Sequence, residues 1–410
     1  MLQIAGCIER SSVPSATFTI DDQEGVPVIL LWSESHRWLG FLWRGDGDFS
    51  QHAAKLIAAC AALVSLLATM SDVCKFPLAI IFLLFTVKVE SKLRFGRWLW
   101  AACTEAQLKL DAAYESWAKQ LLGFDPWRNG AIALGEAGWD LSGSARVVLD
   151  MALLRVKFWK ECRTTLASTM FLKAHGMRGL TWARKSYHLL ATWGVHDWPE
   201  WLVQAKSHES YSGYVKRCLR RRCLAEWSQS VASHVGPLSY STLQAKPTSL
   251  FHIALRLGLL WDALVQQKAL SQLRCGQLVL SHKSGRKSRA SVRQCIFCNK
   301  WYSSIYFHVI CSCAFFCQER RGLVDLGIDV SSLHFLAIGP GDPAYPAIAR
   351  FASSVQFHTY VFWKKGSLGT FDCSADAKKP LLVVRSCEHW VAGAPLPSLP
   401  GLSRLPQCTH

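Results

Sequence analysis

The chain has 410 residues, half of them hydrophobic, which excludes a protein that is disordered throughout and suggests roughly two or three structural units. Its formal net charge of +17 is uneven, since residues 1–70 hold 4 Lys and Arg against 7 Asp and Glu and the rest is strongly basic. A basic body favours a polyanionic partner such as RNA or DNA, although a cationic surface can also serve solubility alone.

The first residues argue against secretion. The segment MLQIAGCIERSS places polar Gln3 and acidic Glu9 where a secretory signal requires an unbroken apolar run. We therefore expect a nuclear or cytoplasmic protein, in which thiols stay reduced. In that setting the 16 cysteines indicate metal binding where they cluster and packing where they are scattered.

The N-terminal region carries β-strand signals. In TFTIDDQEGVPVILLWSESHRWLGFLW, short β-rich runs alternate with turn residues at Asp21–Gly25 and Ser33–His36. This alternation predicts a small antiparallel hairpin.

Two apolar runs follow, at Leu56–Met70 and Phe76–Val87. Each is shorter than the roughly 20 residues that cross a bilayer as a helix, and Asp72 and Lys75 lie between them. We predict that they are buried helices of a soluble domain. A membrane-associated protein anchored through residues 56–87 is the alternative.

Helical patterns dominate the middle of the chain. They predict a helix from Thr104, as its N-cap, to Gly123, and another at Ser144–Thr165. Residues 170–290 are expected to be helical too. Beyond Gly339, the stretches PGDPAYP and APLPSLPGLSRLPQ predict a flexible, proline-rich tail.

Two dense basic runs, KRCLRRR and HKSGRKSR, lie in the second half of the chain. Lysine and arginine at this density attract phosphates without reading base sequence. The alternatives are a solvated helix face for the first run and a nuclear-import signal for either. The residues expected to bind nucleic acid are Lys216, Arg217, Arg220, Arg221, Arg222, Arg274, Lys283, Arg286, Lys287 and Arg289.

The second basic run precedes a cysteine-histidine cluster. Its best four-ligand choice is Cys295, Cys298, His308 and Cys313, a C-x2-C-x9-H-x4-C arrangement. A C-x2-C turn lets two thiolates reach one ion, and an H-x4-C pair lies about one helical turn apart, so the four can close a tetrahedron around zinc. In so small a unit, this structural zinc would provide most of the folding free energy.

Alternatives to this ligand set remain open. Cys311 competes with Cys313, and Cys317 is a further candidate. The thiols could instead be small apolar residues in a packed aromatic mini-core. Among the aromatic side chains, Trp301, Tyr302 and Tyr306 could stack on unpaired bases or belong to that core.

The order of these segments resembles the C-terminal part of LINE-type, non-LTR retrotransposon reverse transcriptases. HRWLGFLW is similar to the hairpin that follows the palm and grips the primer, with Trp38, Leu39 and Gly40 as its primer-grip-like residues. The stretch Ser91–Phe124 resembles the thumb of that family, and Ala133–Lys160 resembles the segment after it.

The other end of the chain fits the same family. There LRCGQLVL, a basic linker and the cysteine-histidine cluster follow one another as in the C-terminal end of these enzymes. The resemblance implies a mainly α fold, with a helical thumb and linker bundle, a small N-terminal β-hairpin remnant of the palm and a C-terminal zinc knuckle. The expected units are a palm-end and primer-grip hairpin at 1–50, thumb-like helices at 51–170, a helical linker region with basic runs at 171–290, a zinc-binding element at 291–330 and a mostly irregular tail at 331–410.

The resemblance also bears on catalysis. In this family the carboxylates that hold two divalent ions lie in the palm, upstream of the primer grip, and only 35 residues precede His36 here. Asp21 and Asp22 lie too close to Trp38 to match that pair. We therefore expect a truncated, reverse-transcriptase-like protein that binds RNA or DNA and does not polymerise. A non-functional fragment of a larger retrotransposon polyprotein is the alternative.

Overall fold

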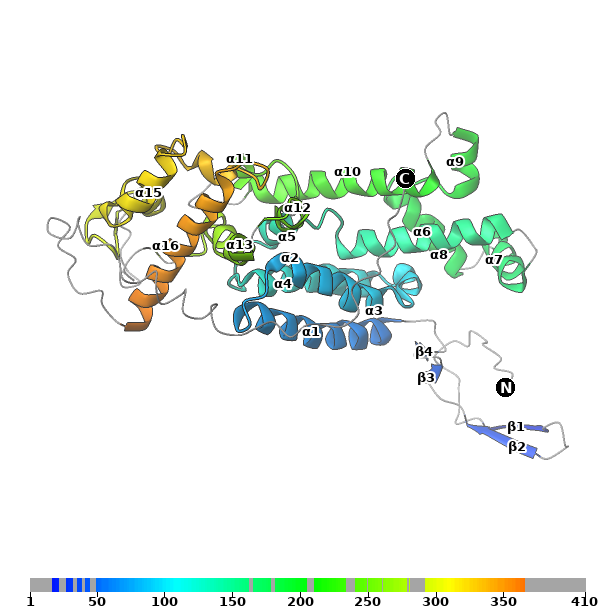
Figure 1. Ribbon diagram of the computed structural model, residues 1–410. Coiled ribbons are helices and arrows are strands. Elements are labelled where there is room, and N and C mark those ends of the chain that lie inside the picture. Colours follow the sequence, from blue (N-terminus) through cyan, green and yellow to red (C-terminus); the bar gives the residue numbers. More distant parts are fainter. Residues whose placement is uncertain are drawn as a thin grey trace, which may run out of the picture. The chain divides into compact units, whose positions relative to one another are not determined.

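The computed structural model describes residues 17–21, 27–31, 35–38, 41–44, 49–161, 165–177, 181–204, 210–233, 240–248, 250–259, 261–278, 280 and 292–365. Figure 1 shows that these residues form mostly helices, with short strands near the N-terminus and in the C-terminal third. The prediction of a mainly α fold is confirmed.

Two hairpins precede the helices, where one was predicted. Strand β1 (Thr17–Asp21) pairs antiparallel with β2 (Pro27–Leu31), and β3 (Ser35–Trp38) pairs antiparallel with β4 (Phe41–Arg44). The turn predicted at residues 33–36 is wrong, because residues 35 and 36 already belong to β3. The other predicted turn lies largely in residues 22–26, outside the described residues.

The two apolar runs form neighbouring helices. Helix α1 (Ser50–Asp72) packs mainly against α4 (Thr104–Leu122). The second run starts after Pro77 as α2 (Leu78–Leu84) and continues as the π-helical turn η1 (Phe85–Glu90) into α3 (Ser91–Arg94). Both runs contribute buried side chains, including Cys60, Val64, Leu67, Leu78, Ile81, Phe82 and Phe85. The expectation of buried helices is correct only in part, because 28% of the most apolar window of α1 is buried and the rest is not.

The length of α1 corrects one expectation. The apolar run looked too short to cross a membrane, but the helix that contains it has 23 residues and an 18-residue window of mean hydropathy 2.0. By length and composition alone, this helix therefore meets the requirement for a membrane span.

Helix α4 ends where the sequence predicts. Gly123 has a φ of +67°, a left-handed conformation that glycine adopts without strain, and a Cβ there would lie 2.8 Å from Gln272 Nε2. The start differs by one residue, since Cys103 occupies the N-cap position and Thr104 is the first helical residue.

An ionic network lies between η1, η2 (Arg97–Ala102) and α6 (Gly143–Glu161), the helix predicted at Ser144–Thr165. Arg97 contacts Glu90 at 3.0 Å and Asp150 at 2.7 Å, and Arg146 contacts Glu90 at 2.9 Å. Arg97 and Glu90 are buried. Because each charge has an opposite partner, the network is tolerated in the interior.

Arg155 of α6 forms a second buried ion pair, with Asp197.

The predicted helical linker is confirmed as helical in its described parts. The helices of residues 171–290 are the end of α7 (Leu166–Gly176), α8 (Trp182–Thr192), α9 (Trp198–Gln204), α10 (Tyr211–Ala232), α11 (Tyr240–Leu243), α12 (Leu250–Arg256) and α13 (Trp261–Arg274). Upstream of them, α5 (Gly130–Ala137) lies between α4 and α6 in the chain.

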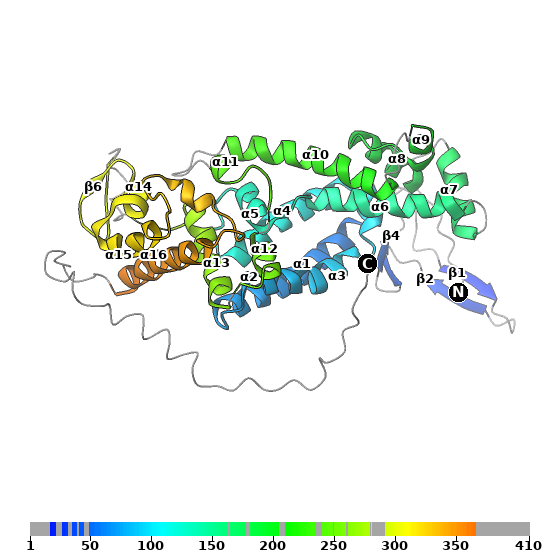
Figure 2. The same cartoon turned by 45° about the horizontal axis from the view of Figure 1, so that its top comes forward.

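Helix α10 buries one residue in every four. The views in Figures 1 and 2 both show α10 beside α6, which it contacts. Side chains four residues apart lie on one face of a helix, so this spacing turns a single stripe toward the interior. The buried residues are Tyr211, Val215, Leu219, Cys223, Trp227 and Val231.

Residues 292–324 form a compact element around the cysteine-histidine cluster. Short strands β5 (Arg293–Gln294) and β6 (Trp301–Tyr302) pair antiparallel. Short helical turns follow: α14 (Ile305–Phe307), η3 (His308–Ser312), η4 (Ala314–Phe316) and α15 (Cys317–Val324).

The expected irregular tail is wrong for part of its length. After η5 (Leu333–Ala337), helix α16 (Tyr345–Lys365) runs beside α13 and α15, which it contacts (Figures 1 and 2). Pro346 is tolerated because it lies in the first turn, where the amide hydrogen has no intrahelical partner. Residues 366–410 lie outside the described residues.

Candidate metal centre

The first two cysteines lie on the turn of the β5–β6 hairpin. The Cys295 amide donates to the Lys300 carbonyl at 2.9 Å, and the Asn299 amide donates to the Cys295 carbonyl at 3.0 Å. Asn299 has a φ of +58°, a left-handed conformation that asparagine tolerates better than most residues. The tight turn brings both thiols to one side, as a metal-binding knuckle requires.

The other two candidate ligands flank the π-helical turn η3. His308 begins the turn and Cys313 follows it, with the Cys313 amide donating to the His308 carbonyl at 2.7 Å. The guanidinium of Arg320, on α15, donates to the carbonyls of Cys313 and, at 3.3 Å, Val309. These bonds fix the backbone that carries the imidazole and the third thiol.

The four predicted ligands converge. The ligand atoms of Cys295, Cys298, His308 and Cys313 all lie within 4.8 Å of one another, and all but Cys298 are buried. The Cys298 Sγ lies 3.2 Å from His308 Nε2. Tetrahedral zinc with Zn–S bonds of the usual length separates its sulfur ligands by about 3.8 Å, so this set fits the metal.

Backbone amides support the sulfur atoms. Phe297 donates its amide hydrogen to Cys295 Sγ at 3.4 Å, and the Cys298 amide also hydrogen-bonds to that sulfur. The amides of Lys300 and Phe315 do the same for Cys298 and Cys313, respectively. Amide donors stabilise thiolate charge, which metal ligation requires.

One of the three thiols, that of Cys295, ionises more readily than a free cysteine. A hydrogen bond from Cys313 lowers the pKa of Cys295 to about 5 and raises that of Cys313 above its usual range. Burial raises the pKa of Cys298. Without metal, one thiolate is therefore shared by neighbouring thiols, and a cation would displace the remaining protons.

The imidazole is oriented by residues that the sequence analysis did not assign. His308 Nδ1 lies 3.2 Å from Ser312 Oγ, and the Tyr302 ring stacks on the imidazole with centroids 3.4 Å apart. Burial lowers the pKa of His308, which favours the neutral form that binds metal through Nε2. The position of Ser312, four residues after His308 and so one helical turn away, was the sequence signal that could have predicted this contact.

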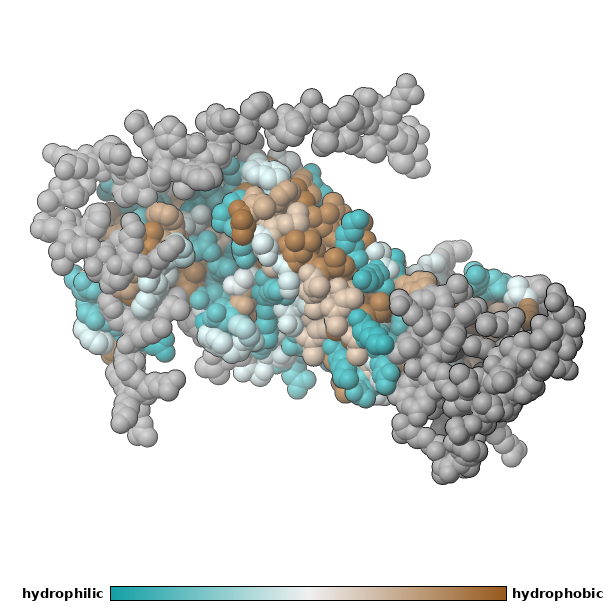
Figure 3. Space-filling model, turned by 90° about the horizontal axis from the view of Figure 1, so that it is seen from below, coloured by the Kyte–Doolittle hydropathy of each residue, from teal (hydrophilic) through white to brown (hydrophobic). Residues whose placement is uncertain are grey.

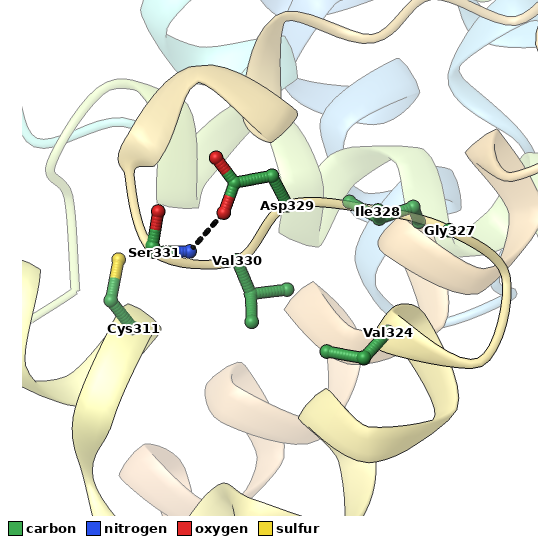
Figure 4. Close-up of a pocket in the computed structure, with 7 residues that line it drawn as sticks. All are labelled: Cys311, Val324, Gly327, Ile328, Asp329, Val330 and Ser331. Atoms are coloured by element: carbon green, nitrogen blue, oxygen red, sulfur yellow. Dashed lines mark hydrogen bonds between the residues drawn. The ribbon is translucent and has the colours of Figure 1, made fainter.

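The structure decides between the alternative ligands. Cys311 is half-buried and Cys317 is exposed, and neither belongs to the cluster. Figure 4 shows Cys311 at a surface depression instead, beside Asp329 and Ser331. Burial raises the pKa of Cys311 to about 11, so this thiol is protonated at neutral pH and is a poor nucleophile.

The aromatic residues around the cluster do pack, so packing and metal ligation coexist. The rings of Phe297, Phe315 and Phe316 contact one another with centroids 4.9–5.2 Å apart. Stacking by Tyr306 on a base is excluded in this arrangement, because that side chain is buried and donates to the Leu278 carbonyl at 2.6 Å. Trp301, at 60% exposure, is open to solvent.

The five cations predicted on α10 are all exposed. Arg220 pairs with Asp140 and Arg222 pairs with Glu226. The Arg222 guanidinium also lies 4.4 Å from the Trp193 ring centroid. Lys216, Arg217 and Arg221 are exposed beside the apolar stripe that faces the interior, and the Arg217 guanidinium lies 5.7 Å from the Tyr214 ring centroid.

The remaining predicted residues do not join this surface. Arg274 as a nucleic-acid ligand is wrong, because its side chain is buried and bonds Glu136 at 3.1 Å, Gln244 at 3.0 Å and the Leu336 carbonyl at 2.9 Å. Trp38 ends β3, opposite Phe41. Residues Leu39, Gly40, Lys283, Arg286, Lys287 and Arg289 lie outside the described residues.

Comparisons with known proteins give no relative. No protein-family model, curated protein or solved structure matches this chain. The resemblance to LINE-type reverse transcriptases therefore depends on the sequence motifs alone, and a function has to be argued from the geometry.

Proposed function

We propose that this chain binds RNA or DNA through the outward cations of α10, and that it corresponds to the nucleic-acid-holding C-terminal part of the LINE-type reverse transcriptases its motifs resemble. The observation that carries this proposal is that α10 turns its apolar stripe inward and leaves Lys216, Arg217 and Arg221 exposed. Cations presented this way contact phosphates and carry no base specificity.

The metal has a structural part in this proposal. Four protein ligands close a tetrahedral site and leave no position for a substrate, as in structural zinc centres. The Ile296 amide donates to the Leu280 carbonyl at 3.3 Å, so the folded element holds the chain on both sides of the basic run at residues 282–289. Zinc would thus fix the two ends of a second phosphate-binding segment.

A metal assay tests this part. The purified protein should carry about one equivalent of zinc, and Cys295→Ser with Cys298→Ser should remove it. The matched control is Cys311→Ser with Cys317→Ser, which alters two nearby thiols outside the cluster and should leave the zinc content unchanged. If only the control variant lost its metal, the ligand assignment proposed for Cys295 and Cys298 would be wrong.

A binding titration tests the main proposal. Anisotropy with a labelled structured RNA should show affinity that falls steeply with salt. Replacing Lys216, Arg217 and Arg221 by Gln should weaken binding and reduce the slope of log affinity against log salt by up to about 3. The control changes three exposed cations elsewhere, Lys75, Lys88 and Lys92, to Gln.

The outcomes are distinct. An affinity that does not respond to salt, or that falls equally in both triple variants, contradicts a phosphate-binding face on α10. The proposal also expects no primer extension with magnesium or manganese, because it assigns holding and not synthesis to this chain. Observed extension would require catalytic carboxylates that we have not identified.

A further inference from the structure

Helix α1 presents an exposed apolar face on the side away from α4. Its outward residues include Ala58, Ala62, Leu66 and, directly after the helix, Val73, with Leu66 58% and Val73 71% exposed. Only 28% of the most apolar window of α1 is buried. In Figure 3, the view from below Figure 1, where α1 lies, apolar residues gather on this face.

The neighbouring helix adds exposed apolar side chains. The chain turns back after α1, and both α2 and η1 contact it. Leu83 and Val87, one turn apart, are 51% and 53% exposed. Apolar side chains left open on adjacent helices are typical of an interaction surface.

Cations accompany these apolar residues. Lys55, Lys75, Lys88, Lys92 and Arg94 are all exposed. The same region, residues 49–103, contains only two acidic residues: Asp72 pairs with Lys268 and Glu90 is buried in the ionic network. The region 49–103 therefore offers both apolar and positively charged side chains to solvent.

We propose that this surface, formed by α1 and by α2, η1 and α3, docks onto an anionic lipid bilayer. The partner must offer both aliphatic contacts and negative charge. Phosphates of a nucleic acid meet the cations but leave the leucine and valine side chains in water. A bilayer with anionic headgroups meets both requirements.

The helix would lie along the membrane surface and would not cross it. Seven residues of α1 are buried in the protein, among them Ala53, Cys60 and Val64, and crossing a bilayer would remove those contacts. Apolar side chains can instead enter the headgroup region while lysines and arginines extend to the phosphates.

Vesicle cosedimentation with the full chain tests this inference. We expect binding to phosphatidylcholine vesicles that contain phosphatidylserine, and little binding to phosphatidylcholine alone. Leu66→Asp with Val73→Asp, and separately Lys88→Gln, Lys92→Gln and Arg94→Gln together, should each weaken binding about tenfold or more. Thermal melting of each variant confirms that it is folded.

Two control variants test whether vesicle binding depends on this surface or on exposed charge and apolar residues anywhere on the protein. Leu166→Asp with Met170→Asp changes two exposed apolar residues on α7, at 78% and 61% exposure. The α10 variant, with Lys216, Arg217 and Arg221 changed to Gln, removes three cations elsewhere. Both should bind vesicles like the unaltered chain, whereas only the α10 variant should bind RNA more weakly.

Three results would overturn the inference: equal binding to both vesicle types, equal losses in the control variants, or an unchanged affinity after the Leu66 and Val73 substitutions. Absence of vesicle binding together with protection of Leu66 and Val73 from hydroxyl-radical labelling would also overturn it, and would indicate that a protein segment covers this face.

Discussion

His308 shows how neighbouring side chains prepare a single residue for a metal. Its Nδ1 is held by Ser312 and its ring by Tyr302, which leaves Nε2 beside Cys298. Ser312→Ala should keep zinc binding but weaken the affinity about tenfold or more, because the imidazole loses its orienting partner. Competition with a chromophoric chelator measures this. The matched control is Cys311→Ser. Equal zinc affinities in the unaltered protein, Ser312→Ala and Cys311→Ser would contradict an orienting role for Ser312.

The thiols make a second prediction, about protons. At pH 7 the lowered pKa of Cys295 gives a thiolate and the lowered pKa of His308 gives a neutral imidazole, whereas the raised pKa values of Cys298 and Cys313 leave both protonated. Zinc binding should therefore release about two protons. Calorimetry in buffers of different ionisation enthalpy counts them. Release of none or of four would contradict this distribution of charge.

Glu90 makes a prediction about stability and pH. Burial alone would raise its pKa, but Arg146, Arg97 and the Tyr114 hydroxyl lower it below the ordinary value of 4.5. A lowered pKa in the folded state means that the ionised group stabilises the fold above that value and that this contribution is lost as the pH falls. Glu90→Gln should destabilise the protein by about 3 kcal/mol at pH 7.

The pH series supplies the control for Glu90. The difference in unfolding free energy between Glu90→Gln and the unaltered protein should shrink as the pH falls below the ordinary value of 4.5, and it should be lost below the lowered pKa of the folded carboxylate, where Glu90 is protonated in both states. Denaturant unfolding at several pH values measures it. A difference that stays constant would show that packing, and not charge, explains the loss.

Among the elements, α16 is the clearest case of a helix held by packing. Its Phe351 is buried, with ring centroids 6.2 Å from Phe316 and 6.1 Å from Phe335. Phe351→Ala should cost about 3–5 kcal/mol of unfolding free energy, as large core truncations do. Phe357→Ala on the same helix, where the side chain is 39% exposed, should cost much less. Equal losses would mean that α16 is not docked.

The sequence predicts elements well where the signal is local. Periodic apolar residues and the terminal Gly123 predicted α4 to within one residue. The C-x2-C and H-x4-C spacings predicted all four ligands that converge in the structure. Helix α16 was missed because Pro340, Pro343 and Pro346 cluster at its start and suggested an irregular segment. Yet its buried side chains recur every three or four residues: Ile348, Phe351, Ala352, Val355, Thr359 and Phe362.

Contacts between distant residues were not predictable from the sequence. Arg274 was expected on a nucleic-acid surface, but Glu136, 138 residues away, neutralises it in the interior. The choice of Cys313 over Cys311 likewise depended on how the π-helical turn directs each thiol. Spacing reports which residues share a face of one element, and it does not report which elements meet.

For the molecule as a whole, metal removal should have a local effect first. The ligands all lie within 295–313, whereas the described helices from α1 to α6 have their own core. Treatment with a chelator should therefore increase hydrogen exchange in residues 292–324 and leave exchange in residues 50–160 nearly unchanged. Mass spectrometry of peptides measures both. A simultaneous rise in both regions would indicate one cooperative unit.

Arg274 has a practical consequence for anyone who divides this polypeptide. Its guanidinium takes partners from positions 136, 244 and 336, which are spread over most of the described chain. A recombinant piece that stops before position 336 keeps a positive charge in an apolar interior and removes an oxygen that compensates it. Assays of either surface should therefore use the intact polypeptide, because inactivity of a shortened piece would report misfolding before it reported function.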